Sequence, residues 1–205
     1  MAIRWIFFDV GGTLSDESEA YAHRAREMLA GTGISLDEYD RARLALAREG
    51  KDGNSAVIAA LGLQKTPWHP EDEVPFADAL ATLTALSARG YRLGVIANQV
   101  AGLRERLAAW GLLPYFEVVI SSADVGVAKP SPDIFRLALE RAGCPVAECV
   151  MVGDRLDNDI RPAKALGMRT VWVRSGLARY QEPSLGDGAA DWQVDTLTEI
   201  LEILK

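Results

Sequence analysis

Asp9 is the residue whose type and position most clearly predict chemistry. It ends the apolar run 5–8 and opens into a turn that contains Gly11 and Gly12. A carboxylate at the carboxyl end of a buried strand stands where open α/β sheets bind their ligands. Asp9 is therefore a candidate nucleophile. The alternative is that Asp9 only caps the turn or helix that follows it.

Three further short apolar runs, at 93–96, 118–120 and 150–152, also lead into polar residues. Those polar residues are Asn98, Lys129, Asp154, Asp157, Asn158 and Asp159. Short apolar runs separated by helical patterns predict buried strands joined by right-handed crossovers in one parallel sheet. Because the carboxyl ends of such strands share one edge, we expect these side chains to meet at a single site.

The residue types at this edge suit phosphoryl transfer, which needs an in-line nucleophile, a cation and fixed hydrogen-bond donors. Asp9 and Asp154 could share one Mg²⁺, which accepts few carboxylates and keeps waters and substrate oxygens. Asp159 or Asp157 could bind the ion directly or through water, although Asp157 is also placed to cap the next helix. Lys129 could bridge Asp9 and the transferring group as a point charge.

Four segments, taken together, resemble the motifs of the haloacid dehalogenase superfamily of hydrolases. They are FDVGGTL at 8–14, IAN at 96–98, KPSPDIF at 129–135 and VGDRLDND at 152–159. The resemblance covers nearly the whole chain, in order and spacing. It implies an α/β fold: a Rossmann-like parallel sheet with helices on both faces, plus a small inserted α-helical cap.

The resemblance also implies a role for each matched residue. Asp9 is the nucleophile and a metal ligand, Lys129 stabilises charge, and Asp154 binds Mg²⁺ with Asp159 beside it. The backbone carbonyl of Gly11 is the implied third protein ligand. The phosphate-binding group is predicted to be Asn98, Gly12 and Thr13, of which Thr13 also stabilises the turn after the nucleophile.

Two positions depart from the family pattern. Phosphatases of this family usually carry a second Asp, a general acid and base, where this chain has Gly11. Such a group is worth about 10²- to 10⁴-fold in rate. Its absence predicts slow turnover, a leaving group that needs little help from a general acid, or a proton donor brought from the cap. Ala97 replaces the usual Ser or Thr, so Asn98 and backbone amides must hold the phosphate.

Helical patterns at 20–29, 36–48 and 56–61 lie between the first strand and the rest of the sheet. We therefore expect a core domain at 1–14 and 76–205 and a helical C1-type cap at 15–75. The basic residues Arg48 and Lys51 flank a glycine break, and we expect them to contact the substrate.

Composition narrows the class of protein. The chain has 205 residues and a net charge of −7, without a block of Lys or Arg, which argues against nucleic-acid or anionic-membrane partners. It shows neither a membrane span nor a signal peptide, so we expect a cytoplasmic monomer or homodimer. Cys144 and Cys149 are expected to stay reduced.

These observations predict a Mg²⁺-dependent phosphatase that acts on a small phosphorylated metabolite through an aspartyl-phosphate on Asp9. One alternative is a weak or degenerate fold of the same family that binds a phosphorylated ligand or a partner. Another is a dehalogenase-like or phosphonatase-like hydrolase. The phosphonatase would need a cap lysine, for which Lys51 and Lys65 are available.

Overall fold

A parallel β-sheet forms the centre of the computed structural model, which describes residues 2–181 and 189–205. The strand order within these residues is β5-β4-β1-β6-β7-β8, and every neighbouring pair is parallel. The strands are β1 (Trp5–Phe8), β4 (Arg92–Ala97), β5 (Phe116–Ser121), β6 (Cys149–Gly153), β7 (Arg169–Val173) and β8 (Trp192–Val194). The predicted parallel α/β fold is thus confirmed.

Both faces of the sheet are buried, which explains the continuous apolar runs in the sequence. In β1, Ile6 and Phe8 pack into one hydrophobic cluster, and Trp5 and Phe7 pack into another on the opposite face. The first cluster is covered by α4 (Ala79–Ala88), α5 (Leu103–Ala109) and α9 (Ile200–Ile203). The second is covered by α7 (Pro132–Ala142) and α8 (Arg161–Ala165).

Short helical segments complete the connections between these elements. They are α6 (Ser122–Val125), the 3₁₀ turns η1 (Pro70–Asp72), η2 (Leu113–Tyr115), η3 (Val146–Glu148) and η5 (Ala178–Tyr180), and the π-helical turn η4 (Leu156–Ile160). No helix among the described residues is long and apolar enough to cross a membrane.

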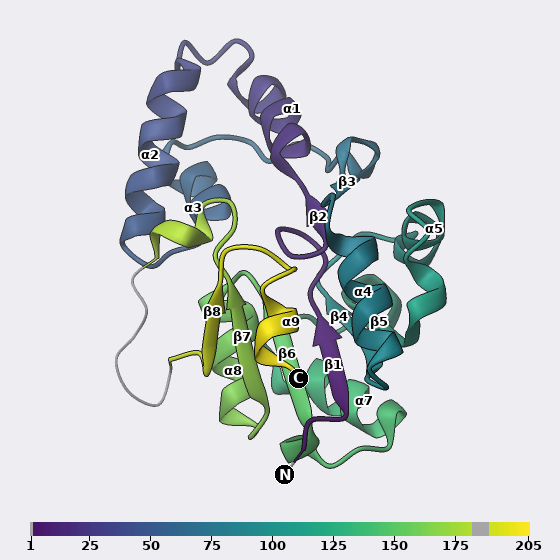
Figure 1. Cartoon of the computed structure of the whole chain (residues 1–205). Helices are drawn as coiled ribbons and strands as arrows, with labels where there is room; N and C mark the ends of the chain where they lie inside the picture. Colours follow the sequence, from purple (N-terminus) through teal and green to yellow (C-terminus); the bar gives the residue numbers. More distant parts are fainter. Residues whose placement is uncertain (1, 182–188) are drawn as a thin grey trace.

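A separate helical module stands over the carboxyl ends of the strands, toward which β1 points (Figure 1). It contains α1 (Ser18–Leu29), α2 (Leu36–Arg48) and α3 (Gly53–Ala60). Their buried apolar side chains form a small core of their own, made of Ala25, Met28, Tyr39 and Val57. The side chains of Ser35 and Asp52 cap α2 and α3 by accepting from backbone amides.

Two short strands join this module to the sheet domain. β2 (Ser15–Asp16) pairs antiparallel with β3 (Val74–Pro75), so the outgoing and returning chains are held together. The predicted cap limits of 15 and 75 fall on this pair. The sequence did not predict the pair itself, because two-residue strands leave no periodic pattern.

Other differences from the predicted elements lie late in the chain. The predicted terminal helix at 197–204 is wrong in extent, because only Ile200–Ile203 is α-helical. The helix predicted from 158 begins as the π-helical turn η4 and continues as α8, with Pro162 in its first turn. Of the irregular stretch predicted at 176–190, residues 182–188 lie outside the described residues, and Ala178–Tyr180 forms the 3₁₀ turn η5.

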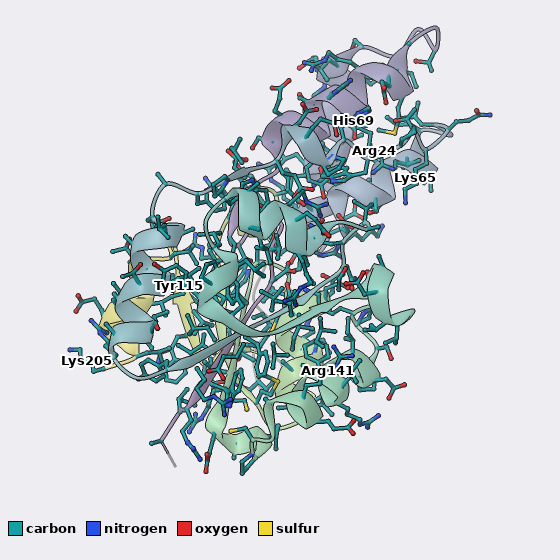
Figure 2. The ribbon with its side chains drawn as sticks, turned by 90° about the vertical axis from the view of Figure 1, so that its right-hand side faces the viewer. Arg24, Lys65, His69, Tyr115, Arg141 and Lys205 are labelled. Carbon is teal, nitrogen blue, oxygen red and sulfur yellow. The ribbon has the colours of Figure 1, made fainter. Side chains whose placement is uncertain are left out.

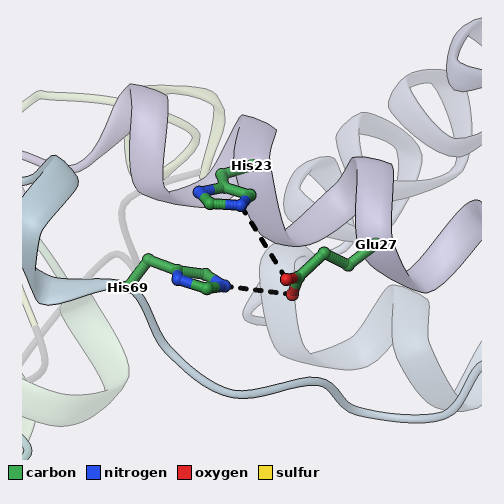
Figure 3. Close-up of side chains that lie close together, drawn as sticks. All are labelled: His23, Glu27 and His69. Atoms are coloured by element: carbon green, nitrogen blue, oxygen red, sulfur yellow. Dashed lines mark ion pairs between the residues drawn. The ribbon is translucent and has the colours of Figure 1, made fainter.

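A network of imidazoles and carboxylates fastens the returning chain to α1 (Figure 3). The rings of His23 and His69 stack with centroids 3.8 Å apart. Glu27 lies 3.0 Å from Nε2 of His69 and 3.8 Å from Nε2 of His23. Asp72 and Glu71 contact the Nδ1 atoms of His23 and His69, at 2.7 and 3.2 Å. The module is therefore clamped near its base by ion pairs that depend on protonation.

The clamp should make the stability of the module depend on pH. Hydrogen bonds to Glu27 and Glu71 raise the pKa of His69 above its ordinary value of 6.5. Its contribution is then fully present below about pH 6.5 and is lost as the pH rises through the raised folded-state pKa. The pKa of Glu27 is lowered by its hydrogen bond to His69, so its share is present above its ordinary value of 4.5.

We expect His69→Gln to lower the melting temperature by roughly 1–2 °C at pH 5.5, because the pair is partly solvated. The effect should nearly vanish at pH 8.5, as measured by calorimetry at matched ionic strength. In a Glu27→Gln background the pH dependence should shrink. A larger destabilisation at pH 8.5 than at pH 5.5 would contradict this reading.

Candidate active site

A cleft of about 800 Å³ lies between the carboxyl edge of the sheet and the helical module. Its floor includes Asp9, Asn98, Lys129 and Asp154, each from the end of a different strand or from the loop after it. The sequence prediction that these residues gather at one edge is thus met by the geometry.

Lys129 holds two carboxylates at the bottom of this cleft. Its Nζ lies 2.6 Å from Oδ1 of Asp9 and 2.6 Å from Oδ1 of Asp159, and all three side chains are buried. Burial alone would lower the pKa of Lys129, but the two carboxylates outweigh it and raise that pKa. Lys129 is therefore an ammonium ion whose charge is directed at the predicted nucleophile.

The side chain of Asn98 holds the backbone of Lys129 in place with two hydrogen bonds. Its Oδ1 accepts from the amide nitrogen of Lys129 at 2.7 Å, and its Nδ2 donates to the Lys129 carbonyl at 2.8 Å. One amide hydrogen of Asn98 remains for another acceptor, since Nδ2 carries two. The predicted phosphate contact stays a prediction, and the structure adds a positioning role that the sequence did not reveal.

Asp154 lies beside Asp9 and Asp159. One oxygen atom each from Asp9, Asp154 and Asp159 lie within 4.8 Å of one another. Oδ1 of Asp154 is buried and has no hydrogen-bond partner. Burial, together with the charges of Asp159 and Asp9, raises the pKa of Asp154 well above its ordinary value. An uncompensated carboxylate at this position fits a hard cation such as Mg²⁺.

Asp159 differs from Asp154 in that both of its oxygens are engaged. Oδ1 faces Lys129, and Oδ2 accepts from the amide nitrogen of Arg155 at 3.0 Å. Gly153 permits this approach, because a Cβ there would lie 2.5 Å from the Asp159 side chain. Direct ligation by Asp159 remains a prediction. Asp157 hydrogen-bonds through both oxygens with Arg155.

The turn after Asp9 is shaped for close contact with Asp154. Gly12 has a φ of 69°, and a Cβ there would lie 2.6 Å from Oδ2 of Asp154. The Gly12 carbonyl accepts from the hydroxyl of Ser175, a cleft residue that the sequence did not single out. Thr13 is buried and its hydroxyl lacks a partner. The predicted contacts of Gly12 and Thr13 with a phosphate stay predictions.

The two basic cap residues that were predicted to contact the substrate, Arg48 and Lys51, both contact other side chains of the protein. Lys51 lines it, but its Nζ is paired with Glu49 at 2.7 Å. Arg48 instead lies over the ring of Tyr180, 5.9 Å from its centroid. Arg43, from the same helix as Arg48, is the arginine of α2 that lines the cleft.

Lys65 lies in the helical module, well above the part of the chain that carries Arg141 and Lys205 (Figure 2). It is exposed and is absent from the lining of the cleft. Of the two cap lysines, Lys51 is thus the one that lines the cleft, and the phosphonatase alternative stays a prediction.

Arg155 connects the two parts of the molecule, and sequence reasoning missed it. Its Nη1 donates to Oδ2 of Asp52 in the cap at 2.9 Å, while its Nε and Nη2 bind Asp157. Both Arg155 and Asp52 line the cleft. An arginine inside the fourth motif could have suggested this, but its partner lies 103 residues away in sequence.

Glu17 is a second cleft residue that sequence reasoning missed. Burial, with the charges of Glu73 and Asp9, raises the pKa of Glu17 to about 8. Its carboxylate occupies the space next to Cα of Gly11, where an ideal Cβ would lie 2.2 Å from Oε1. The space left by the family's missing side chain is thus filled from α1.

Comparisons with known proteins agree with this arrangement. The family model for haloacid dehalogenase-like hydrolases matches residues 3–167. A glyceraldehyde 3-phosphate phosphatase of Methanopyrus kandleri is 32% identical over 227 aligned residues, which cover 99% of this chain and 97% of that protein. A phosphoserine phosphatase of Thermus thermophilus is 37% identical over 138 residues, which cover 67% of this chain and 51% of that protein.

A solved structure gives the same result. The crystal structure of a HAD phosphatase from Thermococcus onnurineus superimposes with a TM-score of 0.67 at 30% identity, covering 98% of each chain. Fold and sequence match point to one class, the hydrolases built on a Rossmann-like parallel sheet. The chain belongs to the haloacid dehalogenase-like hydrolase family.

The buried position of Lys129 predicts a large effect of its removal. We expect Lys129→Met to lower the free energy of unfolding by about 3–5 kcal/mol, because the carboxylates of Asp9 and Asp159 would lose their shared cation. Urea denaturation at pH 7.5 measures this change. Lys65→Met, at an exposed lysine, is the matched control and should change stability by less than about 0.5 kcal/mol. Equal effects of the two substitutions would show that Lys129 carries no structural charge balance.

Proposed function

We propose that this protein is a Mg²⁺-dependent phosphatase that hydrolyses a small phosphorylated metabolite through an aspartyl-phosphate on Asp9. The observation that carries the proposal is the arrangement around Asp9. Its carboxylate opens into the cleft, contacts the ammonium of Lys129, and lies beside the unpartnered Oδ1 of Asp154. A nucleophile, a fixed cation and a vacant carboxylate oxygen are what phosphoryl transfer requires.

The named relatives support the phosphatase branch of the family. The Methanopyrus protein is named for glyceraldehyde 3-phosphate and the Thermus protein for phosphoserine, and both are small phosphate monoesters. The cleft volume of about 800 Å³ also suits a small substrate. We therefore infer a small phosphate monoester as substrate and leave its carbon skeleton open.

Asp9 carries out the first chemical step in this proposal. One of its carboxylate oxygens attacks phosphorus, and the bond between phosphorus and the leaving oxygen breaks. Lys129 neutralises part of the charge on Asp9 and on the equatorial oxygens, so that two anions can approach. Asn98 and Thr13 both line the cleft, and we assign the free amide hydrogen of Asn98 and the unpartnered hydroxyl of Thr13 to the phosphate oxygens.

The metal is assigned to Asp9 and Asp154, whose oxygens belong to the same acidic group. When bound, Mg²⁺ supplies positive charge that neutralises the phosphate and fixes its orientation. Asp154 holds the ion near Asp9, and Gly12 permits this closeness because it has no side chain. Asp159 keeps Lys129 in place from the opposite side.

Substitution of the nucleophile tests the proposal directly. We expect Asp9→Asn to reduce hydrolysis of p-nitrophenyl phosphate at least about 10³-fold, because the amide cannot form the covalent intermediate. Phosphate release is the measurement, and circular dichroism checks the fold. Asp133→Asn, at an exposed carboxylate in α7, is the matched control. Retention of more than a tenth of the activity by Asp9→Asn would reject the proposed nucleophile.

The metal assignment has a separate readout. We expect Mg²⁺ to raise the melting temperature of the wild-type protein, since an ion that binds only the folded state stabilises it. Asp154→Asn should shift the half-maximal Mg²⁺ concentration for this effect upward at least about tenfold. Asp157→Asn should leave it within about twofold, because Asp157 is engaged by Arg155. Stabilisation that is unchanged in Asp154→Asn would reject the assignment.

A further inference from the structure

Position 11 poses a chemical problem for the proposed phosphatase. The bond to the leaving oxygen breaks more easily if that oxygen receives a proton, and the water that later attacks the aspartyl-phosphate must lose one. Gly11 has no side chain to do either. A group that solved this problem would have to reach the cleft near Gly11 from another element.

We propose that Glu17, at the start of α1, is the proton-transfer residue that takes the place of the side chain absent at position 11. This inference rests on the proposed function and extends it. The observation that carries it is steric. An ideal Cβ on Gly11 would lie 2.2, 2.4 and 2.6 Å from Oε1, Cδ and Oε2 of Glu17, so the carboxyl group lies where the missing side chain would begin.

The backbone of Gly11 does not explain the absence of a side chain there. Gly12 has a positive φ, but Gly11 is not among the glycines in the left-handed region. A side chain at position 11 would therefore have to displace the carboxyl end of Glu17, whereas the backbone conformation of Gly11 would accept it. Gly11 and Glu17 form a complementary pair, in which the glycine makes room for the glutamate.

The start of α1 leaves the Glu17 carboxyl free for this position. Glu17 is the N-cap residue of α1, yet its side chain makes no capping hydrogen bond. Asp16 does that instead, since its Oδ1 accepts from the amide nitrogen of Ser18 at 2.8 Å. The capping role that would otherwise engage an acidic side chain at a helix start is thus already filled.

Gln99 fixes the orientation of the Glu17 carboxyl. The Oε1 atom of Gln99 accepts from Nη2 of Arg106 at 2.7 Å, which leaves its NH₂ group to donate to Glu17. Both Glu17 and Gln99 line the cleft. The carboxylates that face Glu17 are Glu73, which precedes β3, Asp9 and Asp154 at the ends of strands, and Asp52 in the cap. Its carboxyl therefore lies in the cleft near Asp9, and none of the ion pairs among the described residues joins it to an arginine or lysine.

The proposed step balances as follows. Asp9 forms a bond to phosphorus while the bond to the leaving oxygen breaks, and that oxygen takes the proton of the Glu17 carboxyl to leave as an alcohol. The Glu17 carboxylate then takes a proton from water as the water oxygen bonds to phosphorus. The bond between phosphorus and Asp9 breaks, phosphate leaves, and both side chains return to their starting forms.

The test compares leaving groups. With p-nitrophenyl, phenyl and ethyl phosphate, we expect Glu17→Gln to lower kcat/KM for ethyl phosphate at least about 10²-fold and for p-nitrophenyl phosphate less than about fivefold. The rate should thus depend more steeply on leaving-group pKa than in wild type. Glu19→Gln, an exposed glutamate of the same helix, is the matched control and should change neither rate. Circular dichroism and the melting temperature report whether Glu17→Gln folds.

A second variant moves the carboxyl to the position that is usual in the family. In Gly11→Asp/Glu17→Ala the obstructing side chain is gone, and we expect ethyl phosphate turnover to recover at least about tenfold over Glu17→Ala alone. Gly11→Asp alone should bring no such gain over wild type, because Glu17 already supplies the proton there.

The outcomes separate this inference from the proposed function. If wild type hydrolyses p-nitrophenyl phosphate through Asp9 but Glu17→Gln changes all three substrates equally or not at all, the inference is overturned and the phosphatase stands. If Asp9→Asn keeps its activity, the proposed function fails and the inference fails with it. Leaving-group dependence in Glu17→Gln together with recovery in the double variant supports both.

Discussion

Carboxylates are concentrated where the strands end, and the ammonium of Lys129 neutralises part of their charge. Its ammonium contacts Asp9 and Asp159 while Asn98 holds its backbone in place. Without that contact, several carboxylates could not share a buried edge at neutral pH. Two acids remain outside its reach, Asp154 and Glu17, and their pKa values are raised. One ammonium therefore serves two carboxylates, and the two acids beyond it favour their protonated forms or a bound cation.

Each of these two acids lies against a different glycine of the turn after Asp9. Gly12 allows Asp154 to approach, and Gly11 allows Glu17 to approach. Two adjacent glycines thus bring in one carboxylate from the sheet domain and one from the cap. A side chain at either position would displace a carboxylate, and at position 12 it would also strain the left-handed backbone.

The core of the site could be predicted from the sequence because it lies at strand ends. Asp9, Asn98, Lys129 and Asp154 each follow an apolar run, and parallel strands bring such ends to one edge. The fold was predictable for the same reason, since strands buried on both faces leave continuous apolar runs.

The residues that were missed act across the two parts of the molecule. In the sequence, Glu17 looks like an ordinary acid at the start of a helix. Its proposed role becomes apparent only from its contact with Gly11, which has no side chain. In the sequence, Arg155 looks like a loop residue. Its role in joining the two parts of the molecule becomes apparent only from its ion pair with Asp52 in the cap. Such contacts have no periodicity and no fixed spacing, so a single sequence does not encode them in a readable form.

The ribbon of β2 and β3 has a mechanical consequence for the cap. Glu17 follows β2 by one residue, so it lies close to any axis about which α1, α2 and α3 could rotate as a lid. Asp52 lies beyond the far end of α2, so the same rotation would pull it away from Arg155. Opening the cleft at its Asp52 side would then shift the carboxyl of Glu17 only slightly relative to Gly11. Access of the substrate and alignment of Glu17 can therefore depend on different contacts: the β2–β3 pair holds the start of α1, and the Asp52–Arg155 ion pair joins the start of α3 to the sheet domain.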